Sequence, residues 1–191
     1  MKEHILIIGF EEFGEYSRNY SGELASGLNR LKIKKHQIIG DVFSINFFEL
    51  DEKILNLLHI YKPKVVLITQ IANVNKVVFD IFAQNMVRGN FKDEQVKKSK
   101  IARGLPITKT YKTSLPVVEI CDYCEEKNIS YRINRIPSCF IANYCFFYTL
   151  YFQQLNQVNF PVGLIRIPYA SVELKKIIEI YEKVFSLSLN K

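Results

Sequence analysis

Apolar and polar residues follow one another along the chain in blocks that predict an α/β fold. Short apolar runs at residues 4–8, 64–69 and 162–167 are typical of buried parallel strands, and further strands are expected at 37–45 and 129–133. Segments with the helical spacing of apolar residues fall between them, at 19–30, 47–61, 76–87, 116–127, 138–154 and 172–185. Strand and helix alternate almost throughout. We therefore expect one three-layer α/β/α domain over residues 1–191, with a mainly parallel, twisted sheet and right-handed crossovers.

This alternation breaks down between residues 88 and 114. Gly89, Gly104 and Pro106 interrupt any regular period there, and only a short hairpin is expected, near residues 107–111. Long excursions of this kind inside a compact domain usually cover a functional site or are disordered. We treat 88–114 as a basic loop excursion from the domain.

Positive charge is concentrated in the same excursion. The formal net charge of the chain is +7, and a 21-residue stretch holds two acidic residues, Asp93 and Glu94, against these basic ones: Lys92, Lys97, Lys98, Lys100, Arg103, Lys109 and Lys112. A basic patch attracts phosphates or acidic partners. Because the stretch lacks a nucleic-acid motif and regular aromatic interleaving, we expect a solvated surface and no nucleic-acid binding.

Composition supports a folded globular protein. The chain has 191 residues, 48% of them apolar, including 14 Phe and 11 Tyr, which excludes a disordered or low-complexity protein. No apolar run reaches the 18 or more residues of a membrane-spanning helix, and the first residues lead directly into a strand pattern. We expect a cytoplasmic protein that needs no cofactor.

The four cysteines allow two interpretations. Cys121 and Cys124 form a C-x-x-C, a spacing found in redox and zinc sites. They lie in a predicted amphipathic helix, however, and no second Cys or His pair stands at a matching distance. Packing of buried thiols in the core is the favoured interpretation for this pair and for Cys139 and Cys145.

Candidate functional residues lie where the predicted strands end, because ligands of parallel α/β sheets bind beyond the carboxyl ends of the strands. The segments concerned are residues 9–14, 70–73, 137–143 and 166–168.

Read in order, these segments resemble pyroglutamyl peptidase I, also called pyrrolidone-carboxylate peptidase. The family opens with G-F-E-P-F-G, matched by residues 9–14, and continues with N-P-S-x-E, matched by residues 19–23. Its Y-x-T-x-L-P corresponds to residues 111–116, its nucleophile region to 128–143, and its closing G-F-I-H-V-P to 163–168. Each match is weak alone, but together they keep register over nearly the whole chain.

The resemblance implies a cytosolic cysteine peptidase in which a cysteine attacks, a histidine takes its proton and a glutamate orients the histidine. Carried over position by position, these three residues fall on Ala142, Arg166 and Asp80. Ala142 has no nucleophile, and a guanidinium stays protonated and cannot act as a base. Asp80 is one methylene shorter than glutamate and is expected to pair with Arg166. Cys139 and Cys145 lie three residues either side of Ala142, with no histidine near them in sequence.

The resemblance also implies a substrate pocket and partners. Its binding positions correspond to Phe10 and Phe13, which sandwich the pyroglutamyl ring in the family, and to Gln70, Ile71 and Asn143. At position 71 the family has the pocket glutamine, so an alkyl chain here leaves polar groups of a bound lactam unmatched, at a cost of about 1–3 kcal/mol. We expect a small molecule or a peptide amino terminus as ligand, no membrane contact, and a homo-oligomer as in the family.

Two functions are compatible with these substitutions. The favoured one is a pseudoenzyme that keeps the peptidase scaffold as a binding module. The alternative is an enzyme of different chemistry on the same scaffold, with Asp80 as acid or base and Arg166 clamping a small acidic or peptide-derived substrate.

Overall fold

A central sheet of seven strands forms the middle layer of the computed structural model, which describes residues 3–14, 17–169 and 173–189. The strand order is β10-β5-β11-β4-β1-β3-β2. The bounds are β1 (Glu3–Phe10), β2 (Lys32–Ile33), β3 (His36–Phe43), β4 (Val65–Ala72), β5 (Val77–Asp80), β10 (Tyr131–Asn134) and β11 (Val162–Pro168). Neighbours run parallel except at two places, where β5 meets β11 and where the short β2 meets β3. The prediction of a mainly parallel sheet is confirmed.

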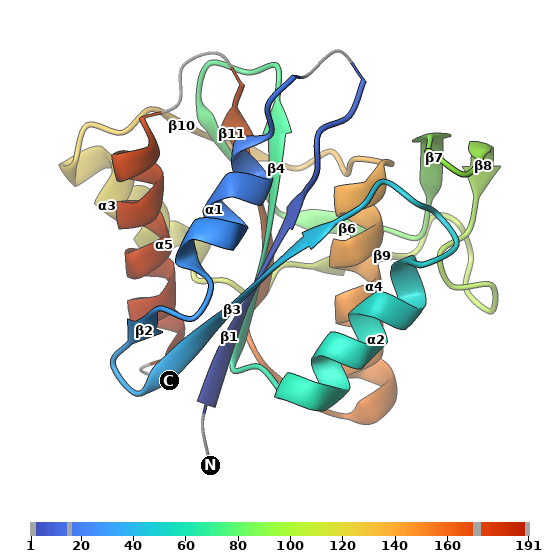
Figure 1. Ribbon diagram of the computed structural model, residues 1–191, viewed down its shortest axis with the longest axis horizontal. Coiled ribbons are helices and arrows are strands. Elements are labelled where there is room, and N and C mark those ends of the chain that lie inside the picture. The colour runs from blue at the N-terminus through green and yellow to red at the C-terminus, as the bar shows by residue number, and fades with distance from the viewer. Residues whose placement is uncertain (1–2, 15–16, 170–172, 190–191) are drawn as a thin grey trace.

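Helices cover both faces of this sheet (Figure 1). One face carries α1 (Tyr20–Leu28), α3 (Val117–Glu126) and α5 (Leu174–Leu189), and the other carries α2 (Leu50–Tyr61) and α4 (Ile141–Asn156). Side chains alternate along β4, so that Val66 and Ile68 join the core under α2 and α4, whereas Val65 and Leu67 join the core on the other side. The predicted three-layer α/β/α arrangement is therefore confirmed. The expected start of the last helix at Val172 lies outside the described residues.

The helix predicted at 76–87 is wrong. Residues 77–80 form β5 inside the sheet, and the chain continues as two further strands, β6 (Phe82–Gln84) and β7 (Val87–Asn90). Val77, Val78 and Phe79 are consecutive and all buried, the pattern of a strand covered on both faces. A short apolar run cannot be told from a buried helix by periodicity alone, and here two β-branched residues and an aromatic one favour the strand.

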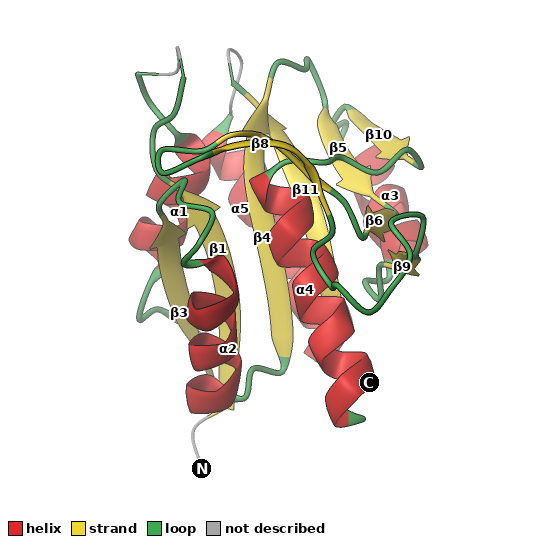
Figure 2. Ribbon diagram, turned by 90° about the vertical axis from the view of Figure 1, so that its right-hand side faces the viewer, coloured by secondary structure: helices red, strands yellow, loops and turns green. Residues whose placement is uncertain are grey.

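The basic excursion contains more regular structure than expected. β7 pairs with β8 (Gln95–Ser99) in a hairpin, and β9 (Thr110–Lys112) pairs with β6 far back along the chain. The expected local hairpin at 107–111 is therefore wrong, because its residues pair with residues 82–84. Both small sheets lie on the α4 side of the main sheet (Figure 2).

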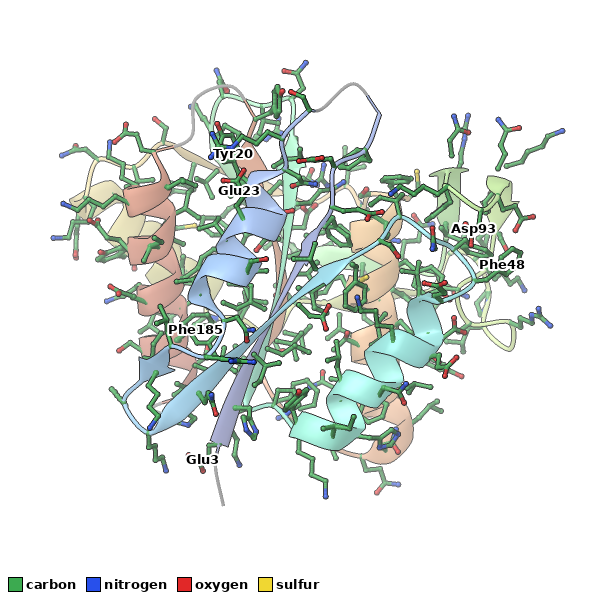
Figure 3. The ribbon with its side chains drawn as sticks, in the orientation of Figure 1. Glu3, Tyr20, Glu23, Phe48, Asp93 and Phe185 are labelled. Atoms are coloured by element: carbon green, nitrogen blue, oxygen red, sulfur yellow. The ribbon has the colours of Figure 1, made fainter. Side chains whose placement is uncertain are left out.

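A single carboxylate fastens the β7–β8 hairpin to the segment before α2. Asp93 accepts hydrogen bonds from the backbone N–H groups of Phe47 and Phe48, at 2.8 and 3.0 Å. Asp93 and the exposed Phe48 lie side by side at the edge of the molecule (Figure 3). Lys92 adds an ion pair to Glu11, with 2.6 Å between Nζ and Oε1. The hairpin is thus tied to residues that follow β1 and β3.

The C-x-x-C cysteines pack in the core, as the favoured interpretation expected. Cys121 and Cys124 are buried on the inner face of α3, among residues of α5. Burial raises the pKa of the Cys124 thiol to about 12, so it stays a protonated thiol at neutral pH. Within the described part of the chain, no helix is long and apolar enough to cross a membrane.

Helix α1 lies unusually close to the sheet because glycines line its contact with β1 and β3. A Cβ atom added to Gly40 would lie 1.8 Å from the carbonyl oxygen of Ala25, and one added to Gly9 would lie 2.1 Å from that of Ser21. Both contacts are with backbone, which cannot swing aside. The helix therefore depends on the absence of a side chain at these two strand positions.

We expect Gly40→Ala to lower the free energy of unfolding by about 1–3 kcal/mol or more, because the new methyl group forces α1 away from the sheet. The matched control is Gly27→Ala in the same helix, where no atom lies within 4 Å of the added Cβ. That change should stabilise the protein by about 0.5–1 kcal/mol through helix propensity. Urea denaturation measures both, and equal effects of the two substitutions would contradict the close contact.

Candidate functional site

A buried ion pair joins two of the three positions that the sequence singled out. Arg166 on β11 donates from Nε to Oδ2 of Asp80 on β5 at 2.6 Å, and from Nη2 to Oδ1 at 2.5 Å. The Asp80 side chain is 1% exposed and that of Arg166 is 19% exposed. This two-bond geometry is the strongest way for a guanidinium to hold a carboxylate.

A third donor completes the surroundings of the carboxylate. Asn134, the last residue of β10, donates from Nδ2 to Oδ1 of Asp80 at 2.5 Å, and also to the carbonyl oxygen of Ile136 at 2.6 Å. Burial raises the pKa of Asp80 above its usual value, while the bonds from Arg166 and Asn134 act in the opposite direction. Sequence analysis missed Asn134; the available signal was a polar residue directly after a predicted strand.

Strand register places the pair on the sheet face covered by α2 and α4. Arg166 follows Val162 and Leu164 on alternate positions of β11, and both of these pack into the core on that face. Its partners across the neighbouring strands are Gln70 of β4 and Val78 of β5. Gln70 therefore lies next to Arg166 on the same face.

Ile71 points the other way. It is 2% exposed and packs in the core beneath α1, α3 and α5. A strand reverses its side chain at each residue, so adjacent positions cannot both face one cleft. Of the two predicted positions on β4, only Gln70 shares a face with the ion pair.

The first turn of α4 holds the third predicted catalytic position, and it is closed to solvent. Ala142 is 0% exposed and belongs to the core cluster on the α2 and α4 face. In Figure 1, α4 begins at the end of the sheet toward which β4 and β11 run. The chain thus has a methyl group, and no nucleophile, at this position.

Asn143 is fully used in holding α4 in place. Its Oδ1 accepts from the backbone N–H of Gln84 at 3.0 Å, and its Nδ2 donates to the carbonyl oxygens of Gln84 and Met86 at 2.9 and 2.8 Å. The side chain is buried and joins the helix to β6 and the residues after it. Its amide is therefore already paired with backbone at the place where the resemblance implied a substrate contact.

Aromatic rings fill the space in front of this turn. Phe140 lies 5.8 Å from Phe13 and 5.2 Å from Phe91 between ring centroids. Its ring also covers Gly89, where an added Cβ would lie 2.3 Å from Cδ2 of Phe140. Phe10 is 0% exposed and contacts the edge of Phe43. The two aromatic positions implied for a substrate ring are thus packed against other parts of the chain.

Of the two cysteines near this turn, only Cys145 is enclosed; Cys139 is half-buried, so the expectation that it packs as a buried core thiol is wrong. Cys145 is buried in the core under α4, and burial raises its pKa above the ordinary value of a thiol. A protonated, enclosed thiol neither attacks a carbonyl nor binds a metal. Across residues 3–14, 17–169 and 173–189, no group of three or more His, Cys, Asp or Glu side chains is placed to hold a metal ion.

A shallow basic pocket opens beside the ion pair. It has a volume of about 420 Å³ and lies between the end of β4 and the strands β5 and β10. Val78, the strand partner of Arg166, forms part of its wall together with Lys76 and Arg132. Neither Arg166 nor Asp80 lines this pocket, but Val78 links it to Arg166 through the strand register, and its cations suit an acidic ligand.

Removing one partner of the ion pair should destabilise the protein strongly. We expect Arg166→Met to cost about 3–5 kcal/mol, because it leaves the Asp80 carboxylate buried without its counter-charge. The double variant Arg166→Met/Asp80→Leu should recover much of that loss. As a matched control, Arg18→Met breaks an exposed pair with Glu23 and should change stability little.

The pH dependence of Arg166→Met provides a second measurement of the same pair. Without the arginine, burial holds the Asp80 pKa higher in the folded than in the unfolded state, so the folded state binds more protons. Stability of this variant should therefore rise, relative to the wild type, as the pH falls from about 7.5 toward 5. A deficit that stays constant over this range would contradict a buried, uncompensated carboxylate.

Comparison with known proteins supports the resemblance found in the sequence. The chain is 25% identical over 169 residues to the pyrrolidone-carboxylate peptidases of Thermococcus litoralis and Pyrococcus furiosus, covering 86% of this chain and 76% and 80% of theirs. The crystal structure of the Thermococcus litoralis enzyme matches with a TM-score of 0.90 at 23% identity, over 98% of this chain and 94% of that one. A mutant of the Pyrococcus furiosus enzyme also gives 0.90, at 20% identity and 98% coverage of both chains.

These solved structures show that the fold is shared, and the family model for pyroglutamyl peptidase matches residues 3–191. The chain belongs to the pyroglutamyl peptidase family.

Proposed function

We propose that this protein is a pyroglutamyl peptidase family member without peptidase activity, which keeps the family fold as a binding module. The observation that carries the proposal is the ion pair between Asp80 and Arg166. At the positions that the resemblance gives to an orienting glutamate and a basic histidine, the two side chains satisfy each other. A protonated guanidinium held by two bonds accepts no proton from a nucleophile.

The state of the α4 turn supports the same proposal. Ala142 supplies no attacking atom, and its methyl group is fully buried. Acyl transfer needs a nucleophile, a base and access for the carbonyl at one point. A buried methyl group at position 142 and a paired guanidinium at position 166 supply none of these.

The alternative, an enzyme that uses Asp80 as acid or base, is less well supported by the contacts. Both oxygens of the carboxylate already accept bonds from side chains, and 1% exposure leaves no room for a reacting group. Arg166 retains some exposure, and its strand partner Val78 lines the basic pocket. We therefore propose a small acidic molecule or an acidic peptide end as the ligand at this edge. A cytoplasmic location and a homo-oligomer, as the resemblance implies, complete the proposal.

Assay of a fluorogenic pyroglutamyl amide tests the loss of activity directly. We expect no turnover above the uncatalysed rate, because neither nucleophile nor base is present at the family positions. The Thermococcus litoralis peptidase, assayed in parallel, controls for substrate quality. A turnover number in the ordinary range of enzymes, about 1–1000 per second, would overturn the proposal.

Restoring the missing side chains tests which position limits activity. Ala142→Cys alone should remain inactive, since Arg166 neither takes the thiol proton nor supplies one to the leaving amine. Ala142→Cys with Arg166→His should exceed it, by a factor on the order of the 10²–10⁴ that a positioned acid–base group contributes. The double variant Ala142→Ser with Arg166→His is the matched control, of similar size but without a thiol. If Ala142→Cys alone equals the double variant, Arg166 does not occupy the base position.

A further inference from the structure

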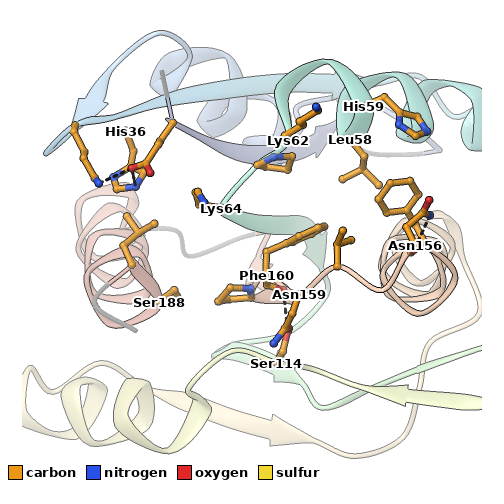
Figure 4. Close-up of a pocket in the computed structure, with 17 residues that line it drawn as sticks. His36, Leu58, His59, Lys62, Lys64, Ser114, Asn156, Asn159, Phe160 and Ser188 are labelled. Carbon is orange, nitrogen blue, oxygen red and sulfur yellow. Dashed lines mark hydrogen bonds and ion pairs between the residues drawn. The ribbon is translucent and has the colours of Figure 1, made fainter. Parts of the chain in front are cut away.

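A second and larger pocket lies at the other end of the molecule, at the amino ends of the parallel strands. Its volume is about 920 Å³, within the range of small-molecule sites (Figure 4). Glu3 begins β1, His36 begins β3, Lys64 directly precedes β4 and Pro161 directly precedes β11. Because parallel strands share one direction, these residues meet at one edge of the sheet. Arg166 and Phe10 lie toward the opposite, carboxyl edge, so this pocket is separate from the family site.

Among the described residues, three buried polar atoms in this pocket make no hydrogen bond: Nδ1 of His36, Oγ of Ser188 and Oε2 of Glu3. The Glu3 oxygen lies within ion-pair distance of Lys35 and His36. His36 and Ser188, which are 4% and 6% exposed, have no such contact at Nδ1 and Oγ. Buried polar groups in folded proteins are almost always paired, and leaving one unpaired is unfavourable. Both side chains line the pocket, from β3 and from the end of α5. A ligand with polar atoms would satisfy them.

The orientation of His36 is fixed by a carboxylate. Its Nε2 lies 2.9 Å from Oε2 of Glu3, the same oxygen that lies 2.9 Å from Nζ of Lys35. The other ring nitrogen, Nδ1, is left without a hydrogen bond. A polar atom of a ligand that reaches the ring would pair with this nitrogen.

Charge in the pocket favours an anion. Among the described residues that line it, three are lysines, Lys35, Lys62 and Lys64, and one is a carboxylate, Glu3, a surplus of two positive charges. Neither Lys62 nor Lys64 forms a side-chain ion pair within the described part of the chain. An anion entering here meets ammonium groups and hydrogen-bond donors together.

Helix ends do not reverse this preference. α2 and α4 both end at the pocket, and the carboxyl end of a helix carries partial negative charge. Two of the carbonyl groups near these ends are already paired, because Leu58 O accepts from Lys62 N and Gln153 O accepts from Gln157 N and Val158 N. Each helix end carries about half an elementary charge, so the full charges of the lysines dominate the field.

Part of the remaining wall is apolar and suits an organic body. Phe160, Phe152 and Leu58 line it, and the ring of His59 packs against Phe152 with 5.3 Å between centroids. In Figure 4, Phe160 and Leu58 lie away from His36 and Ser188, with the polar residues Asn156, Asn159 and Ser114 near them. Apolar surface is thus available beside the lysines, which suits a molecule that joins an anionic group to an aromatic or aliphatic one.

From these contacts we infer that the pocket at the amino edge of the sheet binds a small organic anion. The anionic group, a phosphate or a carboxylate, contacts Lys64, His36 and Ser188, and the apolar body lies against Phe160 and Phe152. This site is independent of the proposed loss of peptidase activity, since it shares no residue with the Asp80 and Arg166 pair.

Isothermal titration of the full chain with phenyl phosphate, benzoate, inorganic phosphate and phenol tests the inference. Phenyl phosphate and benzoate each carry an anionic group on an aromatic ring. At least one of them should bind more tightly than inorganic phosphate and phenol do, because only such a molecule reaches both the lysines and the apolar residues of the pocket. Preference between phenyl phosphate and benzoate identifies the anionic group. Failure of both to bind, or binding no tighter than that of inorganic phosphate, would overturn the inference.

Variants then locate the bound anion. Lys64→Ala and Ser188→Ala should each weaken binding, Lys64→Ala by about tenfold or more, the loss expected for one charge-assisted hydrogen bond. Lys32→Ala on β2 is the matched control, because Lys32 is exposed and does not line the pocket. Lys64 is also exposed, so its replacement should leave the fold intact. Equal effects of Lys64→Ala and Lys32→Ala would show attraction by overall charge alone and refute a defined site.

Discussion

One carboxylate holds the far edge of the sheet together. Asp80 stands at the end of β5, and its oxygens accept from Arg166 of β11 and Asn134 of β10. β5 is only four residues long, so few backbone hydrogen bonds join it to β10 and β11. The ion pair adds side-chain bonds to this short pairing. A carboxylate at the position that the resemblance gives to an orienting glutamate thus links three strands.

The first turn of α4 is closely packed. The ring of Phe140 lies against Phe13, Phe91 and Gly89. Asn143, in turn, gives its whole amide to the backbone of residues 84 and 86. Packing and hydrogen bonding at this turn thus favour rigidity, and the two pockets described above lie elsewhere, beside Arg132 and at the amino edge.

Most of the fold could be predicted from periodicity, and the exceptions have physical reasons. The buried strands β1, β4 and β11 gave uninterrupted apolar runs, and α2, α3 and α4 gave clear helical spacing. The helix predicted at residues 76–87 is wrong because a buried strand followed by two short strands has apolar positions that also fit a helix. The pairing of β6 with β9 depends on contacts between distant residues, which no local pattern encodes. At the site, family motifs pointed to Asp80, Ala142 and Arg166. They did not predict that Ile71 and Gln70 face opposite sides of the sheet, because a sequence motif does not say which face of a strand a side chain occupies.

The place of β11 in the sheet has a consequence for how the chain reaches its native state. β4 and β5 are consecutive in sequence but are not neighbours, because β11 lies between them. The pair formed by β5 and β10 therefore cannot join the rest of the sheet until residues 162–168 have been synthesised. Pairing of this kind joins distant parts of the chain and is slow. During synthesis, the strands that form first therefore leave one edge of β4 unpaired. The sheet is completed only after residues 162–168 have left the ribosome.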